Sequence, residues 1–338
     1  MPEQQHSEAT PGGYGRNPPP FLAPLRGALI WTLIVIWCCV LVIPLFIPIS
    51  LLKFLIPIPA VQYRVTSVLL GLTWIWIGIV KWLSRWAYRI DLDFQGFENI
   101  RRDGHYFFIG NHQSWVDILM LFDIYHNRMP FPRWFMKRSL LWVPLIGYVC
   151  WAVDMPFMYR ISPEQIRKNP KLAGKDLEVT RRSCEKFRHR PVVVTNYLEG
   201  TRNSPAKHAA ANSEYRYLLP PKVGGASFVM SAMGELFDGV LDITLVYPPG
   251  VEPSFLNYSL GRVRKVVVRA RVLPVPAEFL GGDLRNNPQL RQRFRDWINQ
   301  LWRDKDRQIG EIRAELEREF GCTYSLKDNQ IPTPESRA

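Results

Sequence analysis

The sequence predicts an α/β domain that follows a membrane-associated helical hairpin. Two features indicate this fold: a 26-residue stretch without a charge from Gly27 to Leu52, and an alternation of short apolar runs with amphipathic stretches from Ile90 onward. The 338 residues are enough to bury a large core. With 47% apolar and 22% charged residues, the composition excludes a disordered chain.

Five segments are expected along the chain. Residues 1–20 are rich in Pro, Gly, Gln and Ser, which is typical of a disordered tail. After this tail we expect, in order, the hairpin (21–89), the α/β domain (90–282), a C-terminal amphipathic helical segment (283–320) and a second tail (321–338). The five cysteines have neither disulfide-like nor metal-ligand spacing, which indicates a reducing compartment.

The uncharged stretch of the hairpin is long enough, at about 1.5 Å per residue, to cross a hydrocarbon core of roughly 30 Å. A second uncharged run, Val65 to Val80, has 16 residues and reaches that length only if flanking basic side chains extend to the interface. Four prolines are expected to interrupt straight helices here: Pro44, Pro48, Pro57 and Pro59. A spanning hairpin is favoured, and a pair of helices half-buried in one leaflet is the alternative.

The formal net charge of +13 favours an anionic partner. Residues 21–90 contain basic but no acidic residues, so the positive charge adjoins apolar sequence. This arrangement indicates membrane phospholipids rather than nucleic acid. Basic residues are more numerous before and after the hairpin than in its loop, which predicts both ends, and the α/β domain, on the cytoplasmic side of the inner (cytoplasmic) membrane.

The α/β domain is expected to contain six strands and several helices. The predicted strands are Tyr106–Ile109, Arg133–Lys137, Met155–Tyr159, Pro191–Leu198, Val240–Tyr247 and Val263–Leu273. The predicted helices are Ser114–His126, Ser139–Val153, Asp176–His189, Ala226–Phe237 and Asn287–Phe320. The last helix carries an apolar stripe that we expect to pack on the domain, with membrane contact or self-association as alternatives.

Common catalytic motifs such as a phosphate-binding Walker A loop, HExxH and a nucleophile elbow are absent from the sequence, which disfavours nucleotide hydrolysis and zinc chemistry. His112 and Asp117 lie between a predicted strand and a predicted helix. If Ser114 is the N-cap, Asp117 turns back toward the helix entrance and can orient the His112 imidazole as a general base. The alternative is a capping box with His112 as a loop residue.

A second cluster, Glu199-Gly200-Thr201-Arg202, follows directly on the most apolar predicted strand. Loops at the carboxyl ends of strands gather ligands. Lys137 and Arg160 also lie at strand ends, so together these side chains predict an anion pocket beside the His/Asp pair. Basic residues that merely flank strands in solvent are the alternative.

Asn111-His112 with Asp117, followed by Glu199-Gly200-Thr201-Arg202, resembles the 1-acylglycerol-3-phosphate acyltransferase (PlsC-like) family. Phe157-Met158-Tyr159-Arg160 is similar to its second motif, with Met158-Tyr159 where Ile-Asp is more usual. Two further segments resemble the lysocardiolipin acyltransferase-like branch, whose bacterial members are the YihG-type enzymes: Leu218 to Gly225 and Trp302 to Asp306. The resemblance covers about residues 85–310.

The resemblance implies a mixed sheet flanked by helices, with His112 as general base and Asp117 as its partner. It also implies that Glu199, Gly200, Thr201 and Arg202 bind the acceptor's phosphate, with Lys137 and Arg160 as weaker candidates. The expected reaction moves a fatty acyl chain from acyl-CoA or acyl carrier protein to the sn-2 hydroxyl of lysophosphatidate, without metal or cofactor. A lipid hydrolase and a noncatalytic membrane scaffold are the rival functions. Two interpretations remain for the apolar helix Ser139–Val153: it is a core helix, or it forms the wall of an acyl-chain channel.

Overall fold

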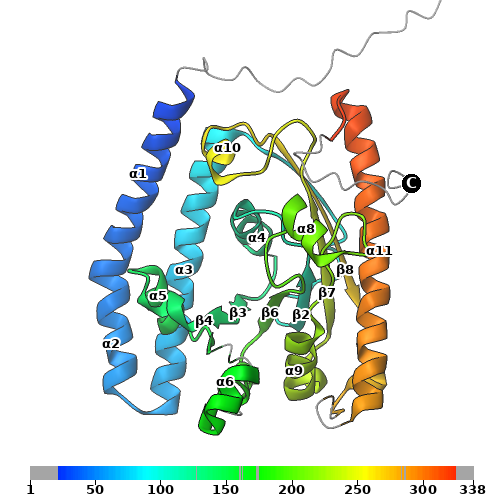
Figure 1. Ribbon diagram of the computed structural model, residues 1–338. Coiled ribbons are helices and arrows are strands. Elements are labelled where there is room, and N and C mark those ends of the chain that lie inside the picture. The colour runs from blue at the N-terminus through cyan, green and yellow to red at the C-terminus, as the bar shows by residue number, and fades with distance from the viewer. Residues whose placement is uncertain are drawn as a thin grey trace, which may run out of the picture.

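The computed structural model describes residues 22–324, except 127, 160, 162, 173–174, 283 and 285–286. A six-stranded sheet lies at the centre, with helices on both faces and the hairpin along one side (Figure 1). The predicted α/β fold, with a mixed sheet flanked by helices, is therefore confirmed. The predicted tail 1–20 and residues 325–338 lie outside the described residues.

The central sheet has the strand order β1-β8-β7-β2-β6-β3. Its strands are β1 (Asp91–Gln95), β2 (His105–Gly110), β3 (Pro132–Trp134), β6 (Val192–Tyr197), β7 (Gly239–Val246) and β8 (Lys265–Leu273). Strands β2, β3, β6 and β7 are parallel, β8 is antiparallel to β7, and β1 is parallel to β8. The carboxyl ends of β2, β6 and β7 therefore meet at one edge of the sheet.

Three strand predictions need correction. The prediction missed β1 because Asp91-Leu92-Asp93-Phe94-Gln95 is largely polar, as an edge strand can be. Arg133–Lys137 divides into β3 and β4 (Met136–Lys137), and Met155–Tyr159 contributes only β5 (Phe157–Met158). Strands β4 and β5 pair with each other in a separate two-stranded sheet.

Helices cover the two faces of the sheet. In the α/β domain they are α4 (Val116–Tyr125), α5 (Ile146–Ala152), α6 (Pro163–Lys168), α7 (Lys175–Phe187), α8 (Pro205–Ala211), α9 (Val223–Met233), α10 (Phe255–Ser259) and α11 (Pro288–Phe320). Helices α7, α9 and α11 share one core cluster with the sheet, and α4 and the hairpin share another on the opposite face. The sheet thus separates the hairpin from α11 (Figure 1).

The predicted helix Ser139–Val153 is not continuous. A 3-10 turn (Arg138–Trp142) is followed by Pro144, by Leu145 with φ +61°, and only then by α5. Pro144 has no amide hydrogen for a continuous helix, so the chain breaks there. Helix α5 packs on the hairpin, while Trp142 is 82% and Ile146 58% exposed. The end of this segment, with Ala152 and Val153 buried, thus belongs to a core cluster, whereas its first half is largely exposed.

Helix α11 confirms that its apolar stripe packs on the domain. Asn287 Oδ1 accepts a hydrogen bond from Leu290 N at 2.9 Å at the start, and Gly321 ends the helix at φ +62°. Residues along the stripe are buried: Leu290, Phe294, Leu301, Ile309, Ile312 and Leu316. The predicted tail begins too early, because Tyr324 is buried and its hydroxyl donates to Tyr247 O at 2.7 Å.

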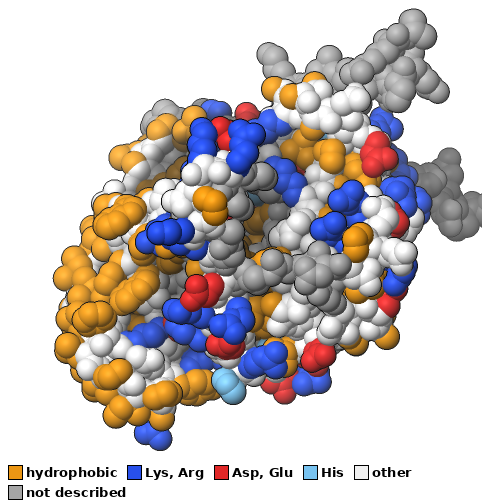
Figure 2. Space-filling model, turned by 60° about the horizontal axis from the view of Figure 1, so that its bottom comes forward, with side chains coloured by type: hydrophobic (Ala, Val, Ile, Leu, Met, Phe, Trp, Pro, Cys, Tyr) orange, Lys and Arg blue, Asp and Glu red, His pale blue; other side chains and the backbone are white. Residues whose placement is uncertain are grey.

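The hairpin consists of α1 (Ala23–Leu41), a π-helical turn (Val42–Phe46), α2 (Ile47–Leu55) and α3 (Pro59–Tyr88). Pro57 and Pro59 separate α2 from α3 as expected, but Pro44 and Pro48 do not break the helical path from Ala23 to Leu55, because Pro44 lies in the π turn and Pro48 in the first turn of α2. By length and hydropathy, both Ala23–Leu55 and Pro59–Tyr88 could cross a membrane. Their outward side chains form the apolar surface on the left of Figure 2.

Both ends of the hairpin contact the α/β domain. Near the start of α1, Trp31 Nε1 donates to Ser259 Oγ at 2.7 Å. At the opposite end, Lys53 forms a 2.7 Å ion pair with Asp154, and Arg190 donates to Tyr63 O at 2.7 Å. The hairpin therefore lies along the domain instead of projecting away from it.

Lys305 connects α11 to β7 inside the core. Its side chain is 0% exposed, is ion-paired with Asp242, and donates to Ile243 O at 2.8 Å and Thr244 Oγ1 at 2.9 Å. Burial lowers the pKa of Lys305, because the charged form has lost its water. Lys305 is thus the polar attachment that sets the position of α11 on the sheet.

Lys305→Ala should lower the free energy of unfolding by about 3–5 kcal/mol, because it leaves Asp242 buried with less compensation. Denaturant titration of the purified protein in detergent measures the change. Arg295→Ala, on the exposed side of the same helix, is the control and should shift the value by about 0.5 kcal/mol or less. Equal stabilities for the two variants would contradict the role given to Lys305.

Candidate active site

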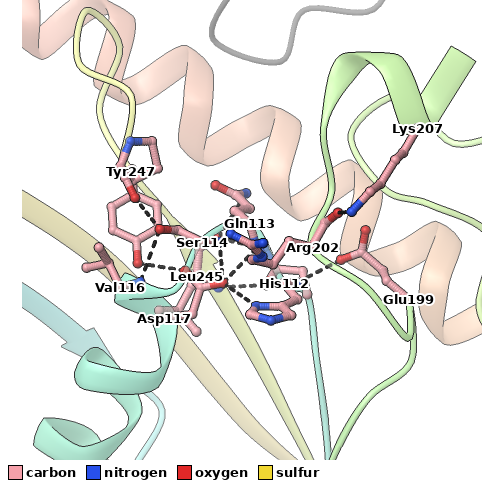
Figure 3. Close-up of polar contacts among 12 residues, drawn as sticks. His112, Gln113, Ser114, Val116, Asp117, Glu199, Arg202, Lys207, Leu245 and Tyr247 are labelled. Atoms are coloured by element: carbon pink, nitrogen blue, oxygen red, sulfur yellow. Dashed lines mark hydrogen bonds and ion pairs between the residues drawn. The ribbon is translucent and has the colours of Figure 1, made fainter. Parts of the chain in front are cut away.

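Three loops at the carboxyl edge of the sheet form the candidate site (Figure 3). They follow β2, β6 and β7, whose parallel arrangement brings their ends together. Asn111, the first residue after β2, joins two of them: its amide donates to Leu245 O at 2.8 Å and accepts from Leu245 N at 2.9 Å. Through these two bonds, the Asn111 side chain continues the hydrogen bonding between β2 and β7 beyond the end of β2. The bonds also fix the start of the loop that contains His112.

His112 and Asp117 are in direct contact. His112 Nδ1 lies 2.8 Å from Asp117 Oδ2, which also accepts from Gln113 N at 2.6 Å and Ser114 N at 2.9 Å. The carboxylate accepts these bonds, so Nδ1 carries the proton and Nε2 presents its lone pair. Among the described residues, Nε2 has no hydrogen-bond partner, and the side chain is 14% exposed. The predicted geometry of the pair is therefore present.

The predicted N-cap is off by one residue, because Trp115 and not Ser114 occupies the N-cap position of α4. Helix α4 begins at Val116, and Ser114 Oγ accepts from Val116 N at 3.1 Å while donating to Pro253 O. Asp117 lies in the first turn of α4 and points back to the loop, as expected. The capping interactions and the His/Asp contact thus occur together, so they are not alternatives in this structure.

Glu199 is a buried acid that holds the His112 loop. It is 1% exposed, and its two oxygens accept from His112 N at 2.7 Å and Leu219 N at 3.0 Å. Loss of hydration on burial raises the pKa of Glu199 to about 8. Asn203 N in turn donates to His112 O at 2.7 Å. The backbone N–H and C=O of His112 are therefore both hydrogen-bonded to the loop after β6. Glu199 contributes to the site by positioning His112.

Two tyrosines that the sequence analysis did not select complete the site. The Tyr197 ring stacks on the His112 ring with centroids 4.1 Å apart and planes 13° apart. The Tyr247 hydroxyl donates to Asp117 Oδ1 at 2.7 Å. Burial raises the pKa of both tyrosines well above the usual value, so both remain neutral. Their positions at the ends of β6 and β7 could have indicated from the sequence that they belong to the site.

Arg202 is exposed beside the pair. Its guanidinium carbon lies 4.9 Å from the centre of the Trp115 ring, and Lys207 Nζ donates to Thr201 Oγ1 at 2.7 Å and Arg202 O at 3.0 Å. Gly200 has φ +65°, and a Cβ there would lie 2.8 Å from Lys222 Cδ, so this turn requires glycine. The four residues from Glu199 to Arg202 thus place two further cations, Lys207 and Lys222, near the site.

Lys137 is not part of this cluster. It is exposed on β4, and no hydrogen bond, ion pair or ring contact joins it to the site within the part of the chain that the structure describes. Arg160 lies outside the described residues. Both remain predictions. No group of three or more potential metal-ligating side chains gathers among the described residues.

Comparison with known proteins finds similarity to acyltransferases in the central part of the chain. Residues 91–248 match the family model described as Acyltransferase. The chain is 25% identical over 178 residues to 1-acyl-sn-glycerol-3-phosphate acyltransferase delta of Mus musculus, a match that covers 50% of this chain and 42% of that protein. It is 24% identical over 225 residues to the alpha protein of Homo sapiens, covering 65% of this chain and 66% of that protein.

A solved structure is also similar, that of the 1-acyl-sn-glycerophosphate acyltransferase PlsC from Thermotoga maritima. It is 16% identical with a TM-score of 0.44, covering 82% of this chain and 97% of that chain. The family match itself includes His112, Asp117 and Glu199 with both of their loops. Residues 91–248 are therefore similar to acyltransferase domains.

Proposed function

We propose that this protein is a membrane-bound acyltransferase that moves a fatty acyl chain from a thioester donor to a lysophospholipid, most specifically to the sn-2 hydroxyl of lysophosphatidate. The observation that carries the proposal is the His112–Asp117 contact, with Nε2 unpartnered among the described residues and Arg202 exposed beside it. The names of the relatives support lysophosphatidate as acceptor. The segments Leu218 to Gly225 and Trp302 to Asp306 favour the lysocardiolipin acyltransferase-like, YihG-type branch.

The geometry supports a general-base mechanism. His112 Nε2 accepts the proton of the acceptor hydroxyl as that oxygen attacks the thioester carbonyl. Asp117 stabilises the imidazolium through Nδ1, while Tyr197 holds the plane of the ring. The thiol leaving group, with a pKa near 8.5, departs with little acid assistance, so the reaction needs no covalent acyl-enzyme. Arg202 binds the acceptor's phosphate. We propose no metal or cofactor beyond the acyl-CoA or acyl carrier protein thioester.

The experiment that tests this function uses purified protein in detergent with a panel of lysophospholipids and acyl thioesters. Mass spectrometry should find the acyl chain in phospholipid, with lysophosphatidate the best acceptor. Free fatty acid as the main product would indicate the rival hydrolase. A protein that turns over no substrate, and whose cellular role survives His112→Ala, would be the rival scaffold.

His112→Ala should lower kcat by at least about a hundredfold, because general-base catalysis contributes roughly 10²–10⁴. Asp117→Asn should do slightly less harm and keep the fold, since an amide can still accept from His112 and can donate to the Tyr247 hydroxyl. Steady-state kinetics give the rates and circular dichroism verifies folding. Tyr247→Phe, which removes one bond to Asp117 and leaves the pair intact, is the milder control. Half-normal transfer by folded His112→Ala would refute the mechanism.

Arg202→Ala should raise KM for the lysophospholipid far more than KM for the donor, because a charge-assisted bond to phosphate is lost. Separate titrations of the two substrates measure this. Arg295→Ala, on the exposed side of α11, serves as the comparison and should change neither KM. Equal KM changes for both substrates would mean that Arg202 only supports the loop.

For the hairpin, we propose the half-buried arrangement in the cytoplasmic leaflet of the inner membrane. The sequence favours a spanning hairpin, but that arrangement would separate the tip from the α/β domain by the whole hydrocarbon core. In the structure, Lys53 and Tyr63 at the tip contact Asp154 and Arg190 of the domain. The ion pair therefore supports a tip that stays on the domain's side, with the outward apolar surface in lipid.

A cysteine at Ala60, at the exposed tip, should react with an impermeant maleimide only after cells are lysed. The background is a variant without other cysteines, and labelled protein is quantified on gels. His189→Cys, in the α/β domain beside Tyr63, is the matched control and should behave identically. Labelling of Ala60→Cys but not His189→Cys in intact cells would restore the spanning hairpin.

A further inference from the structure

A second polar pocket lies on the surface formed by α11 and the segment before α9. It has a volume of about 430 Å³ and is lined by Arg216, Tyr217, Asp306, Arg307, Gly310, Arg313, Ala314 and Glu317. We call it the α11 pocket. The mechanism above uses none of these side chains.

Arg313 is the buried cation of the α11 pocket. It is 7% exposed, and its guanidinium carbon lies 3.5 Å from the centre of the Tyr324 ring and 4.9 Å from that of Tyr217. Its Nη2 is buried without a hydrogen-bond partner among the described residues. A guanidinium held between two rings has a fixed edge, and an unpaired donor on that edge is costly unless an anion accepts from it.

The acidic side chains of the α11 pocket are occupied by backbone amides. Asp306 accepts from Arg216 N at 2.9 Å and Tyr217 N at 2.7 Å, and Glu317 accepts from Tyr324 N at 3.0 Å. Arg216 and Arg307 are exposed at the same pocket, and the nearest acid to Arg307 is Asp304 at 3.6 Å. Arg216, Arg307 and Arg313 thus line one concavity in which Asp306 is occupied through both oxygens and Glu317 through one, and guanidinium groups gathered in this way suit phosphate.

Short hydrogen-bonded paths connect the α11 pocket to the candidate active site. Tyr217 O accepts from Asn203 Nδ2 at 2.8 Å, and Asn203 N donates to His112 O. Tyr324 donates to Tyr247 O, and Tyr247 donates to Asp117. The pocket belongs to α11, across the sheet from the hairpin (Figure 1), so its ligand arrives from water and not from the lipid surface.

We propose that the α11 pocket binds phosphate groups of coenzyme A when acyl-CoA is the donor. This inference rests on the proposed function and assigns the donor side of that reaction. Coenzyme A is water-soluble, carries three phosphates, and places its thioester at the end of a long pantetheine arm that can extend from the pocket toward His112. A concave site of this size suits a small molecule, whereas an acidic carrier protein would require cations spread over a flatter surface.

The test is calorimetric titration of the full-length protein in detergent with coenzyme A and with dephospho-coenzyme A, without turnover. Arg313→Gln should raise the Kd for coenzyme A about tenfold or more, through loss of a charge-assisted bond. Arg216→Gln with Arg307→Gln removes only exposed side chains and should do the same with the fold intact. Arg303→Gln with Arg318→Gln removes two charges from α11 outside the pocket and should leave Kd unchanged.

Unchanged coenzyme A affinity in the Arg216/Arg307 double variant overturns the inference. Equal losses in the control pair also overturn it, since the effect would then be one of overall charge. Displacement of coenzyme A by short-chain phosphatidate in the wild type, but not in the double variant, assigns the pocket to lipid phosphate instead and overturns it too. Acyl transfer by the wild-type protein is measured separately. Normal transfer supports the proposed function whatever the titrations show, and absence of transfer refutes that function.

Discussion

The carboxylate of Asp117 is the interaction on which the candidate site depends. It is completely buried and accepts four hydrogen bonds, from His112 Nδ1, Gln113 N, Ser114 N and the Tyr247 hydroxyl. These donors come from the loop after β2 and from the end of β7, so one side chain of α4 joins three elements. A buried carboxylate is stable only when donors satisfy its oxygens. The four hydrogen bonds therefore hold the donor groups in place together with Asp117.

The loop after β6 is fixed to the same centre from the other side. Glu199 and Asn203 bind the backbone of His112, while Glu199 also binds Leu219 N. Trp302 Nε1 donates to Leu219 O at 2.9 Å, and Lys305 attaches the same helix to β7. The loop that holds His112, the cluster that begins at Glu199 and the segment 302–306 thus form one continuous hydrogen-bonded unit. The four-residue cluster that begins at Glu199 has two parts: an acid that organises the loops and an exposed arginine available to a ligand.

Apolar patterns predicted most of the fold, because β2, β6, β7, β8 and α11 each bury a regular set of side chains. The hydropathy pattern could not predict β1, because its residues are largely polar. The strand forms through its hydrogen-bonded pairing with β8. Local spacing predicted the His112–Asp117 contact, since both residues belong to one turn. Tyr197 and Tyr247 were missed because their contacts depend on how distant strands align. Similarly, the tip of the hairpin is positioned by Asp154 and Arg190, about a hundred residues away in the chain, and no local pattern reports such pairs.

The attachment of the hairpin at both ends has a consequence for geometry. Contacts at Ser259 and at Asp154 hold the hairpin against the α/β domain at two separate places. In the proposed membrane arrangement, the depth of the outward apolar side chains in the leaflet sets the height of His112 above the hydrocarbon. The proposed lysophospholipid acceptor would then reach His112 by lateral diffusion in the membrane, with its glycerol hydroxyls at a height set by its own headgroup. In that arrangement, the regioselectivity of acyl transfer depends on the position of the protein in the bilayer as well as on the shape of the site.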